Sequence, residues 1–233
     1  MNRRIITIDD VTMKYGKEYA INNVSLNLSS NRIVGLCGPN GAGKTTLIKM
    51  IVGLIRSYDG VIKINGEFVS QKTKAMVSYQ PDVITLDKNL TGQRAAKEFS
   101  DLYSDFDHKR FLELVEKLKL PLNKPLSKMS KGMKEKFQLA ITLSRDAHVY
   151  IFDEPIAGVD PASRDSILET IIQYYTKDSL LIVSTHLIQD IESILDEVIF
   201  INEGQIILHE NCDDLRAQRQ MSIDEIFREE FRW

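Results

Sequence analysis

The sequence predicts an α/β protein with a mainly parallel sheet, an antiparallel β part and an α-helical insert. Residues 5–13 and 20–28 alternate apolar and polar side chains, which is typical of paired strands. From about residue 88 to 146 the apolar period becomes helical. Strand-length apolar runs then alternate with helical segments, in the order strand 149–152, helix 161–175, strand 180–184, helix 187–195 and strand 198–201. Such alternation predicts a parallel sheet with helices on both faces.

The composition limits the possible classes of protein. Of the 233 residues, 43% are hydrophobic and 27% are charged, which is ordinary for a globular protein. The formal net charge of −3 gives no overall basic footprint, so we expect no nucleic-acid partner. No apolar run approaches the ~18–20 residues of a membrane span, and residues 1–6 lack the pattern of a secretory signal, so we expect a cytosolic protein. Cys37 and Cys212 have no C-x-x-C spacing, which predicts neither a metal site nor a disulfide.

A glycine-rich loop over residues 38–46 is the strongest local signal. It follows the apolar run 33–37, precedes the helical run 47–51 and has the pattern G-x-x-x-x-G-K-T. Its backbone N–H groups and the helix N-terminus can wrap a phosphate chain, which predicts the core of a P-loop NTPase. Lys44 would contact the β- and γ-phosphates, and the Thr45 hydroxyl would ligate Mg²⁺. The candidate nucleotide-binding residues of the loop are Gly38, Asn40, Gly41, Ala42, Gly43, Lys44, Thr45 and Thr46. The loop alone does not separate a kinase, a GTPase, a helicase and a transporter motor.

The segments around this loop predict the antiparallel part. Residues 15–17 form a turn between the first two strands, and Tyr15 is either a turn-edge aromatic or a ring that stacks on a nucleotide base. A helix of about ten residues follows the loop and ends near Gly53. Turn residues at 59–60 and 65–66 bound the strand 61–64. A further strand over 74–79 is stopped by Gln80-Pro81, because proline cannot donate to a ladder.

The insert and the chain end predict four more helices. We expect helices over 90–103, 108–120 and 131–146. In the second of these, Phe111, Leu114, Val115 and Leu118 share one face. The last segment, 222–233, begins with a capping box and carries an apolar stripe that we expect to dock on its own domain. One domain is expected over 1–233, with a nucleotide core over 1–87 and 147–221 that includes the antiparallel part, a helical subdomain over 88–146 and a C-terminal helix over 222–233.

Two acidic residues end the apolar strand 149–152. An Asp at this position beside a phosphate loop is where a Mg²⁺-bridging carboxylate belongs, and a neighbouring Glu can activate water. We therefore assign Asp153 to the metal and Glu154 to the water. Standing alone, the pair would indicate an acidic turn after a buried strand, but the phosphate loop favours the catalytic interpretation.

These motifs together resemble the nucleotide-binding subunit of an ATP-binding cassette (ABC) transporter, of a bacterial export type. The family order is an aromatic residue, the phosphate loop, a strand-ending glutamine, a helical insert, a signature loop before a helix, the Asp-Glu pair, a small loop ending in Asp, and a histidine at a strand end. Here the counterparts outside the phosphate loop and the Asp-Glu pair are Tyr15, Gln80, the signature loop 129–133, the loop 157–160 with Asp160, and His186. The resemblance runs through essentially the whole chain.

The resemblance implies roles for further residues. His186 would reach the γ-phosphate and the attacking water, and Gln80 would touch Mg²⁺ and that water and link the core to the insert. Ser130 and Gly132 would bind the γ-phosphate of an ATP held by another copy. Asp160, at the end of the loop that follows the catalytic acids, would be a further nucleotide-binding residue. Lys131 and Met133 depart from the family's usual Leu-Ser-Gly-Gly-Gln, and Ile156 from the usual small polar residue. We expect these departures to tune activity.

The resemblance thus implies an ATPase that uses ATP and Mg²⁺ to drive a separate integral membrane subunit. Two cassettes, in a homodimer or heterodimer, would close on two ATP molecules at the inner face of the cell membrane. The membrane subunit would dock near residues 80–105, with Tyr103 and Phe106 as apolar anchors. An alternative is a soluble cassette ATPase that acts on nucleic acid or ribosomes, although such relatives usually carry two cassettes or a long coiled coil. A scaffold without turnover is a third interpretation, against which Glu154 and His186 argue.

Overall fold

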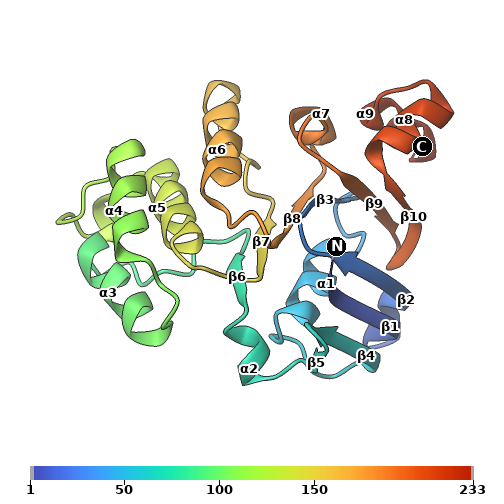
Figure 1. Cartoon of the computed structure of the whole chain (residues 1–233), viewed down its shortest axis with the longest axis horizontal. Coiled ribbons are helices and arrows are strands. Elements are labelled where there is room, and N and C mark those ends of the chain that lie inside the picture. The colour runs from blue at the N-terminus through green and yellow to red at the C-terminus, as the bar shows by residue number, and fades with distance from the viewer. Residues whose placement is uncertain (1–2, 232–233) are drawn as a thin grey trace.

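The computed structural model describes residues 3–231 and contains two sheets (Figure 1). In this part of the chain, the antiparallel sheet has the order β2-β1-β4-β5, with β1 Arg4–Tyr15, β2 Glu18–Ser29, β4 Asp59–Ile64 and β5 Glu67–Phe68. The second sheet has the order β10-β9-β3-β8-β7-β6, with β3 Arg32–Cys37, β6 Val77–Gln80, β7 Val149–Asp153, β8 Leu180–Thr185, β9 Glu197–Asn202 and β10 Gln205–Asn211. The predicted α/β class with a mainly parallel sheet and an antiparallel part is confirmed. The expected ends of the domain, at 1 and 233, fall outside the described residues.

The central sheet is parallel except at one edge. Strand β3 pairs in parallel with both β8 and β9, and β7 lies in parallel between β6 and β8. Only β10 runs antiparallel among the described strands of this sheet, against β9. The carboxyl ends of β3, β7 and β8 therefore lie at the same sheet edge, where ligands bind in open α/β sheets.

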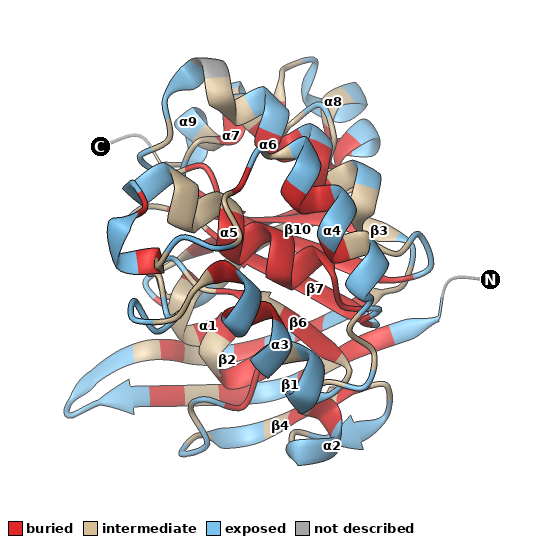
Figure 2. Cartoon of the chain, turned by 90° about the vertical axis from the view of Figure 1, so that its left-hand side faces the viewer, coloured by how far each residue is buried: buried red, intermediate tan, exposed pale blue. Residues whose placement is uncertain are grey.

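Two hydrophobic layers cover the two faces of this sheet. Strand β7 shows the division, because Val149 and Ile151 belong to the layer shared with the antiparallel sheet, whereas Tyr150 and Phe152 belong to the layer under the other helices. Alternate side chains of a strand point to opposite faces, so a strand buried on both sides is apolar throughout. Helix α1 (Lys44–Ile51) packs in the first layer, beside the antiparallel sheet. Figure 2 shows the strands of the central sheet buried beneath helices whose outer faces are exposed.

The helical insert lies at one side of the sheet (Figure 1). It consists of α3 Gly92–Leu102, α4 His108–Lys117, the short 3₁₀ turn Leu126–Lys128 and α5 Lys131–Leu143. Phe111 of α4 and Phe137 of α5 meet edge to face with ring centroids 5.8 Å apart. The N-caps are Thr91, Asp107 and Ser130, whose side chains each accept a backbone N–H of the first turn. The three helices that the apolar period predicts in this segment are confirmed, with no boundary shifted by more than three residues.

Two local predictions were wrong in part, and some elements were not predicted. The strand expected over 74–79 begins only at Val77, because Ser70 and Thr73 cap a short helix α2 (Gln71–Lys74). The helix expected over 187–195 is only α7 (Ile188–Ile191), and Asp196, which accepts the backbone N–H of Ile33, directly precedes β9. Strand β10 and helix α8 (Cys212–Arg219) were not anticipated. Helix α6 (Pro161–Tyr174) is confirmed.

The C-terminal helix α9 (Ile223–Glu230) packs on its own domain, as expected from its apolar stripe. Its capping box joins Ser222 and Glu225, and Ile223 and Ile226 are fully buried. Phe227 lies edge to face on Phe200 of β9, with ring centroids 5.3 Å apart. Residues 232–233 of the predicted segment lie outside the described residues. Within the described part of the chain, no helix has the length and apolar character needed to span a bilayer.

We predict that Ile226→Ala lowers the melting temperature. Shortening a fully buried isoleucine leaves a cavity and costs ~2–5 kcal/mol, which for a chain of this size is a shift of roughly 4–20 °C. Thermal unfolding followed by circular dichroism measures it. Glu229→Ala, on the exposed face of the same helix, is the control and should shift the midpoint by less than ~2 °C.

Truncation before Ser222 should destabilise the protein without changing its oligomeric state, and a change from dimer to monomer without nucleotide would contradict docking of α9 on its own chain.

Candidate nucleotide-binding site

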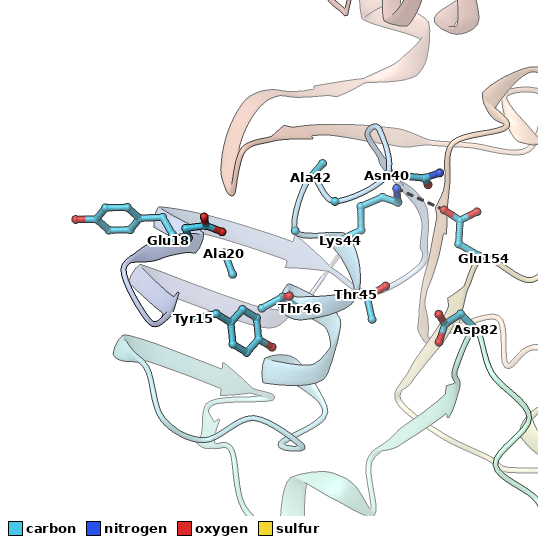
Figure 3. A pocket seen from close by; sticks show the side chains of 13 residues that line it. Tyr15, Glu18, Ala20, Asn40, Ala42, Lys44, Thr45, Thr46, Asp82 and Glu154 are labelled. Atoms are coloured by element: carbon cyan, nitrogen blue, oxygen red, sulfur yellow. Dashed lines mark ion pairs between the residues drawn. The ribbon is translucent and has the colours of Figure 1, made fainter.

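A cleft of about 380 Å³ lies where the phosphate loop meets the β1–β2 hairpin (Figure 3). The loop forms its floor, the hairpin contributes Tyr15, Glu18 and Tyr19, and Asp82 and Glu154 close the opposite end. Antiparallel and parallel sheets thus each supply one wall. The hairpin residues Glu18 and Tyr19 and the loop residue Asp82 were missed by the sequence analysis.

The phosphate loop is held in a conformation that requires glycine. Gly43 has φ of 109° and immediately precedes α1, and a Cβ there would lie 2.6 Å from the carbonyl oxygen of Ala20. A Cβ on Gly38 would lie 2.3 Å from the carbonyl oxygen of Ile201. Both glycines therefore allow the loop to press against neighbouring backbone. The free N–H groups at the start of α1 and the positive end of its dipole favour an anion here.

Lys44 is the buried cation of the cleft. Only 6% of the residue is exposed, and its Nζ donates hydrogen bonds to the carbonyl oxygens of Gly38 at 2.7 Å and Pro39 at 3.1 Å. The same Nζ lies 3.4 Å from Oε1 of Glu154, the ion pair drawn in Figure 3. Lys44 thus connects the phosphate loop to the end of β7.

Asp153 presents one free carboxylate oxygen. Its Oδ1 accepts hydrogen bonds from Ser184 Oγ at 2.5 Å and Thr45 Oγ1 at 3.3 Å, whereas its Oδ2 is buried and has no partner among the described residues. Burial raises the pKa of this carboxyl, the hydrogen bonds from Ser184 and Thr45 lower it, and the charges of Asp82 and Glu154 raise it further. A buried, unpaired carboxylate oxygen beside a threonine hydroxyl is suited to a hard cation with oxygen ligands.

Glu154 lies between Lys44 and His186. It has a left-handed backbone conformation with φ of 52°, which costs energy for a residue other than glycine. Its backbone N–H donates to the carbonyl oxygen and to Oγ of Ser184, both at 3.1 Å, so β8 holds this conformation. Its Oε2 is 3.0 Å from Nδ1 of His186, the exposed residue directly after β8. The structure therefore brings together Lys44, Glu154 and His186 from three separate segments.

Gln80 does not line the cleft. It ends β6 and is 5% exposed, and its buried Oε1 has no partner among the described residues. Ser78, two residues earlier, donates to the carbonyl oxygen of Thr142 in α5, so by strand alternation Gln80 faces the insert. Asp82, beyond the bend at Pro81, enters the cleft instead. The structure thus places Asp82 where the sequence analysis expected Gln80, because the strand pleat and the bend were not visible in the motif.

Ser130, Gly132 and Asp160 lie outside the cleft. Ser130 and Gly132 are exposed at the start of α5, where Ser130 Oγ accepts the N–H of Met133 at 3.2 Å. A Cβ on Gly132 would meet nothing within 4 Å, so this surface is open. Asp160 is the N-cap of α6 and accepts the N–H of Ser163 at 3.1 Å. Within this chain Ser130 and Asp160 therefore cap helices and Gly132 lies in the first turn of α5, and none of the three lines the cleft.

A second groove of about 420 Å³ lies between the insert and β6. Tyr103 lines it, as expected, but Phe106 instead packs against the helical core and contacts Phe111. Phe99, Leu54 and Val83 add apolar surface. The sequence analysis named none of these three, although Val83 and Phe99 fall within the segment 80–105 that it expected to face the partner.

The buried Arg145 closes the same groove. Its guanidinium lies 3.7 Å from the ring centroid of Tyr103 and donates to Asp105 Oδ1 at 2.6 Å. It also donates to the carbonyl oxygens of Ala75 at 2.6 Å and Val77 at 3.3 Å. The hydrogen bonds of Arg145 therefore hold the insert against the edge strand β6. No sequence pattern predicts that an arginine shortly before a buried strand would hold the insert to the sheet edge.

A family model and similar sequences indicate the same class of protein as the phosphate loop and the acidic residues of the cleft. A family model described as ABC transporter matches residues 21–157, more than half of the chain. The lantibiotic transport ATP-binding protein SrtF of Streptococcus pyogenes is 29% identical over 211 residues, covering 90% of this chain and 92% of that protein. The ABC transporter ATP-binding protein NatA of Bacillus subtilis is 29% identical over 238 residues, covering 96% of each.

A solved structure described as an ATP-binding subunit of an ABC transporter superposes with a TM-score of 0.87 at 26% identity, covering 97% of this chain and 98% of that one. The family model, the similar sequences and this fold together show that the chain belongs to the ABC transporter family, as a nucleotide-binding domain.

Proposed function

We propose that this chain binds and hydrolyses ATP and thereby drives a separate integral membrane subunit of a transporter. The observation that carries the proposal is Glu154, whose two carboxylate oxygens lie 3.4 Å from Lys44 Nζ and 3.0 Å from His186 Nδ1. A carboxylate placed between a phosphate-binding lysine and a histidine is suited to accept a proton from an attacking water. The ATP-binding relatives reported above support the choice of nucleotide.

ATP would bind along the cleft with its phosphates on the loop. The N–H groups of residues 41–46 would contact the phosphates, and Lys44 would exchange the carbonyl oxygens of Gly38 and Pro39 for phosphate oxygens. Tyr15 and Tyr19 are exposed on the hairpin at the other end, where an aromatic ring can stack on the base. The cleft thus separates a phosphate end from a base end.

Mg²⁺ fits the polar groups beside the phosphate end. Asp153 has a buried oxygen without a partner, and Thr45 has a hydroxyl next to it. No group of three or more His, Cys, Asp or Glu side chains within the described residues could hold a metal alone. Mg²⁺ commonly uses one or two carboxylates and completes its shell with phosphates and water, so Asp153 and Thr45 could hold it together with the phosphates of ATP. When bound, Mg²⁺ would neutralise charge on the phosphates.

Hydrolysis would use Glu154 as the general base. Its carboxylate would take the proton of a water aimed at the γ-phosphate, and His186 would hold Glu154 and the water in position. Lys44 would stabilise the charge that develops on the phosphoryl oxygens. The backbone bonds to Ser184 keep the base at the end of β7 throughout.

We further propose that two cassettes close on two ATP molecules. Ser130 and Gly132 are exposed at the N-terminus of the 13-residue helix α5 but remain outside their own cleft. A helix N-terminus with a serine hydroxyl is suited to a phosphate, so these residues would complete the site of a second copy or of a related cassette.

We also propose that the whole chain is one ATP-binding domain. It would have a nucleotide core over 1–87 and 147–221, a helical subdomain over 88–146 and a C-terminal helix over 222–233.

The membrane subunit would dock in the groove beside β6. That groove joins apolar side chains with Lys49, Lys74 and Arg145, and it lies between the insert and the sheet that carries the site. A rigid segment seated there would follow any rotation of the insert. The protein would therefore work in the cytoplasm, attached peripherally to the inner face of the membrane.

Our first functional prediction is that Glu154→Gln still binds ATP but hydrolyses it about 10²–10⁴-fold more slowly, the usual contribution of a general base. Phosphate release with Mg²⁺ measures the rate, and fluorescent-nucleotide titration measures binding. Glu169→Gln, an exposed residue of α6, is the matched control and should keep the parental rate. Hydrolysis by Glu154→Gln at the parental rate would exclude Glu154 as the base.

Our second functional prediction is that Glu154→Gln dimerises with ATP but not with ADP. Ser130 and Gly132 of one copy would bind the γ-phosphate of the ATP held by the other copy, and ADP has no γ-phosphate. Light scattering coupled to gel filtration decides this. Adding Ser130→Asp should abolish the dimer, since aspartate still caps the helix but repels phosphate. Ser222→Asp makes the same change at the cap of α9 and should have no effect. A monomer at saturating ATP would argue against a homodimer.

Our third functional prediction is that cysteines in the groove cross-link to the membrane subunit. Val83→Cys and Leu54→Cys are exposed groove positions, and Ile207→Cys on β10 is the control at the opposite sheet edge. The two native cysteines should stay unreactive, because burial raises the thiol pKa of both, that of Cys212 to about 12. The chain is co-expressed in membranes with candidate integral membrane subunits, chosen from neighbouring reading frames that encode several apolar spans. Cross-links from Ile207→Cys alone would exclude the groove.

A further inference from the structure

Basic side chains gather on the part of the insert that leads into α5. Residues 88–94 and 122–134 together contain six basic side chains and no acidic one. Backbone hydrogen bonds of 2.7 to 3.0 Å join these two stretches, among them the bond from the N–H of Leu126 to the carbonyl oxygen of Leu90. Side chains that are far apart in the sequence therefore share one region of positive charge.

Five of these six side chains are exposed and have little negative charge near them. They are Lys88, Arg94, Lys124, Lys128 and Lys131, which we call the cationic surface. Within residues 3–231, the first four form no ion pair, and Lys131 pairs only with Glu135, at 3.7 Å, with 74% of its side chain exposed. The chain as a whole has a net charge of −3, so this positive surface is a local feature. Concentrated like charge favours a negatively charged partner.

The cationic surface adjoins the start of α5. Lys128 lies two residues before Ser130, and Lys131 lies between Ser130 and Gly132. The Nζ atom of Lys131 is 3.5 Å from the place that a Cβ on Gly158 would occupy, in the loop that follows β7. A partner that meets Ser130 and Gly132 would therefore also meet these lysines.

The candidate nucleotide-binding cleft carries the opposite charge. Glu18, Asp82 and Glu154 line it, and Lys44 is the only basic side chain in that lining within the described residues (Figure 3). Bound ATP would add negative charge that Mg²⁺ cancels only in part. An ATP-loaded cleft is therefore complementary in charge to the cationic surface, whereas an empty cleft or one that holds ADP is less so.

We propose that the cationic surface of one cassette attracts the ATP-loaded cleft of a second cassette, which makes their association fast at low salt and sensitive to salt. This inference rests on the proposed ATP site and on the proposed pair of cassettes. Ser130 and Gly132 would act at contact, whereas exposed charges act over about 10 Å at ~0.1 M salt, before contact is made. Charges at the rim of an interface mainly raise the rate of association. The departure of Lys131 from the family's usual signature loop would then strengthen this attraction.

The test removes two charges from the cationic surface in the Glu154→Gln protein, which serves as the parent. Lys124→Gln and Lys128→Gln together leave the first turn of α5 intact. Sedimentation velocity with saturating ATP measures the dissociation constant of the pair, and stopped-flow light scattering measures its association rate. At ~50 mM NaCl we expect a dissociation constant roughly 5–50-fold higher than in the parent, mostly through slower association. At ~500 mM NaCl the two proteins should agree within about twofold, because salt screens exposed charges.

Two controls separate this attraction from folding and from nucleotide binding. Lys109→Gln with Lys177→Gln removes the same net charge from exposed positions outside the cationic surface, and it should keep the parental dissociation constant at both salt concentrations. Titration with a fluorescent nucleotide should give the same ATP affinity for all three proteins. Circular dichroism should give melting temperatures that agree within ~2 °C, because all four lysines are exposed.

The outcomes separate the inference from the proposed function. If the parent pairs with ATP and Lys124→Gln with Lys128→Gln pairs equally well at ~50 mM NaCl, the inference is overturned and the pair of cassettes stands. A parental dissociation constant that does not rise with salt also overturns it. So does a variant that pairs like the parent but no longer floats with phosphatidylglycerol vesicles, because the surface would then belong to a lipid membrane. If the parent binds ATP but stays monomeric, the proposed homodimer fails together with the inference, and if it binds no ATP, the proposed function itself fails.

Discussion

The parallel pairing of β3, β7 and β8 is the constraint on which the site depends. Each of these strands ends at the same sheet edge, so the phosphate loop after β3, the two acids at the end of β7 and the histidine after β8 meet although they are far apart in the chain. Register matters as much as direction. Asp153 pairs with Ser184, and this pairing gives both the hydrogen bond to Asp153 Oδ1 and the bonds that hold the backbone of Glu154. A slip of one residue would turn these side chains to the other face of the sheet.

The buried ammonium group of Lys44 has polar partners before any nucleotide binds. Lys44 is almost fully buried, and burying an unpaired ammonium group is costly. Two carbonyl oxygens and Glu154 satisfy it. Phosphate oxygens would offer the same lysine stronger, charged acceptors, so ligand binding would release Glu154 from this pair. The arrangement thereby links occupancy of the phosphate site to freedom of the proposed base.

Polar contacts attach the helical insert to β6 and to the loop beside the cleft. Arg145 bonds to the backbone on the approach to β6 and to Asp105 within the insert. Gln138 bonds to the loop that carries Asp82. Gln138 belongs to α5 and Arg145 lies two residues after its end, and the N-cap of α5 is Ser130, the proposed contact to a second cassette. One rigid helix therefore joins the surface that would meet another copy, the loop at the cleft and the groove proposed for a membrane partner.

The sequence by itself determined the features that depend on neighbouring residues. The glycine loop with Lys44 and Thr45, the apolar strand ending in Asp153 and Glu154, the helical period of the insert and the stripe of α9 are local patterns, and the structure contains each of them. Family resemblance further identified His186, which lies beside Glu154. The sequence analysis did not recognise the capping box that starts the short helix α2, and it therefore placed the beginning of the next strand too early.

Only the tertiary structure decided which side chains reach the cleft and which anchor the insert. Gln80 and Asp82 differ by two positions in a polar stretch, and the pleat of β6 with the bend at Pro81 turns the first toward α5 and the second toward the nucleotide loop. Arg145 and Gln138 bond to backbone carbonyl oxygens of distant segments. Every residue carries a backbone carbonyl, so the sequence does not show which ones accept these bonds. Motifs thus located the chemistry of this protein, whereas long-range strand register and buried hydrogen bonds determined its geometry.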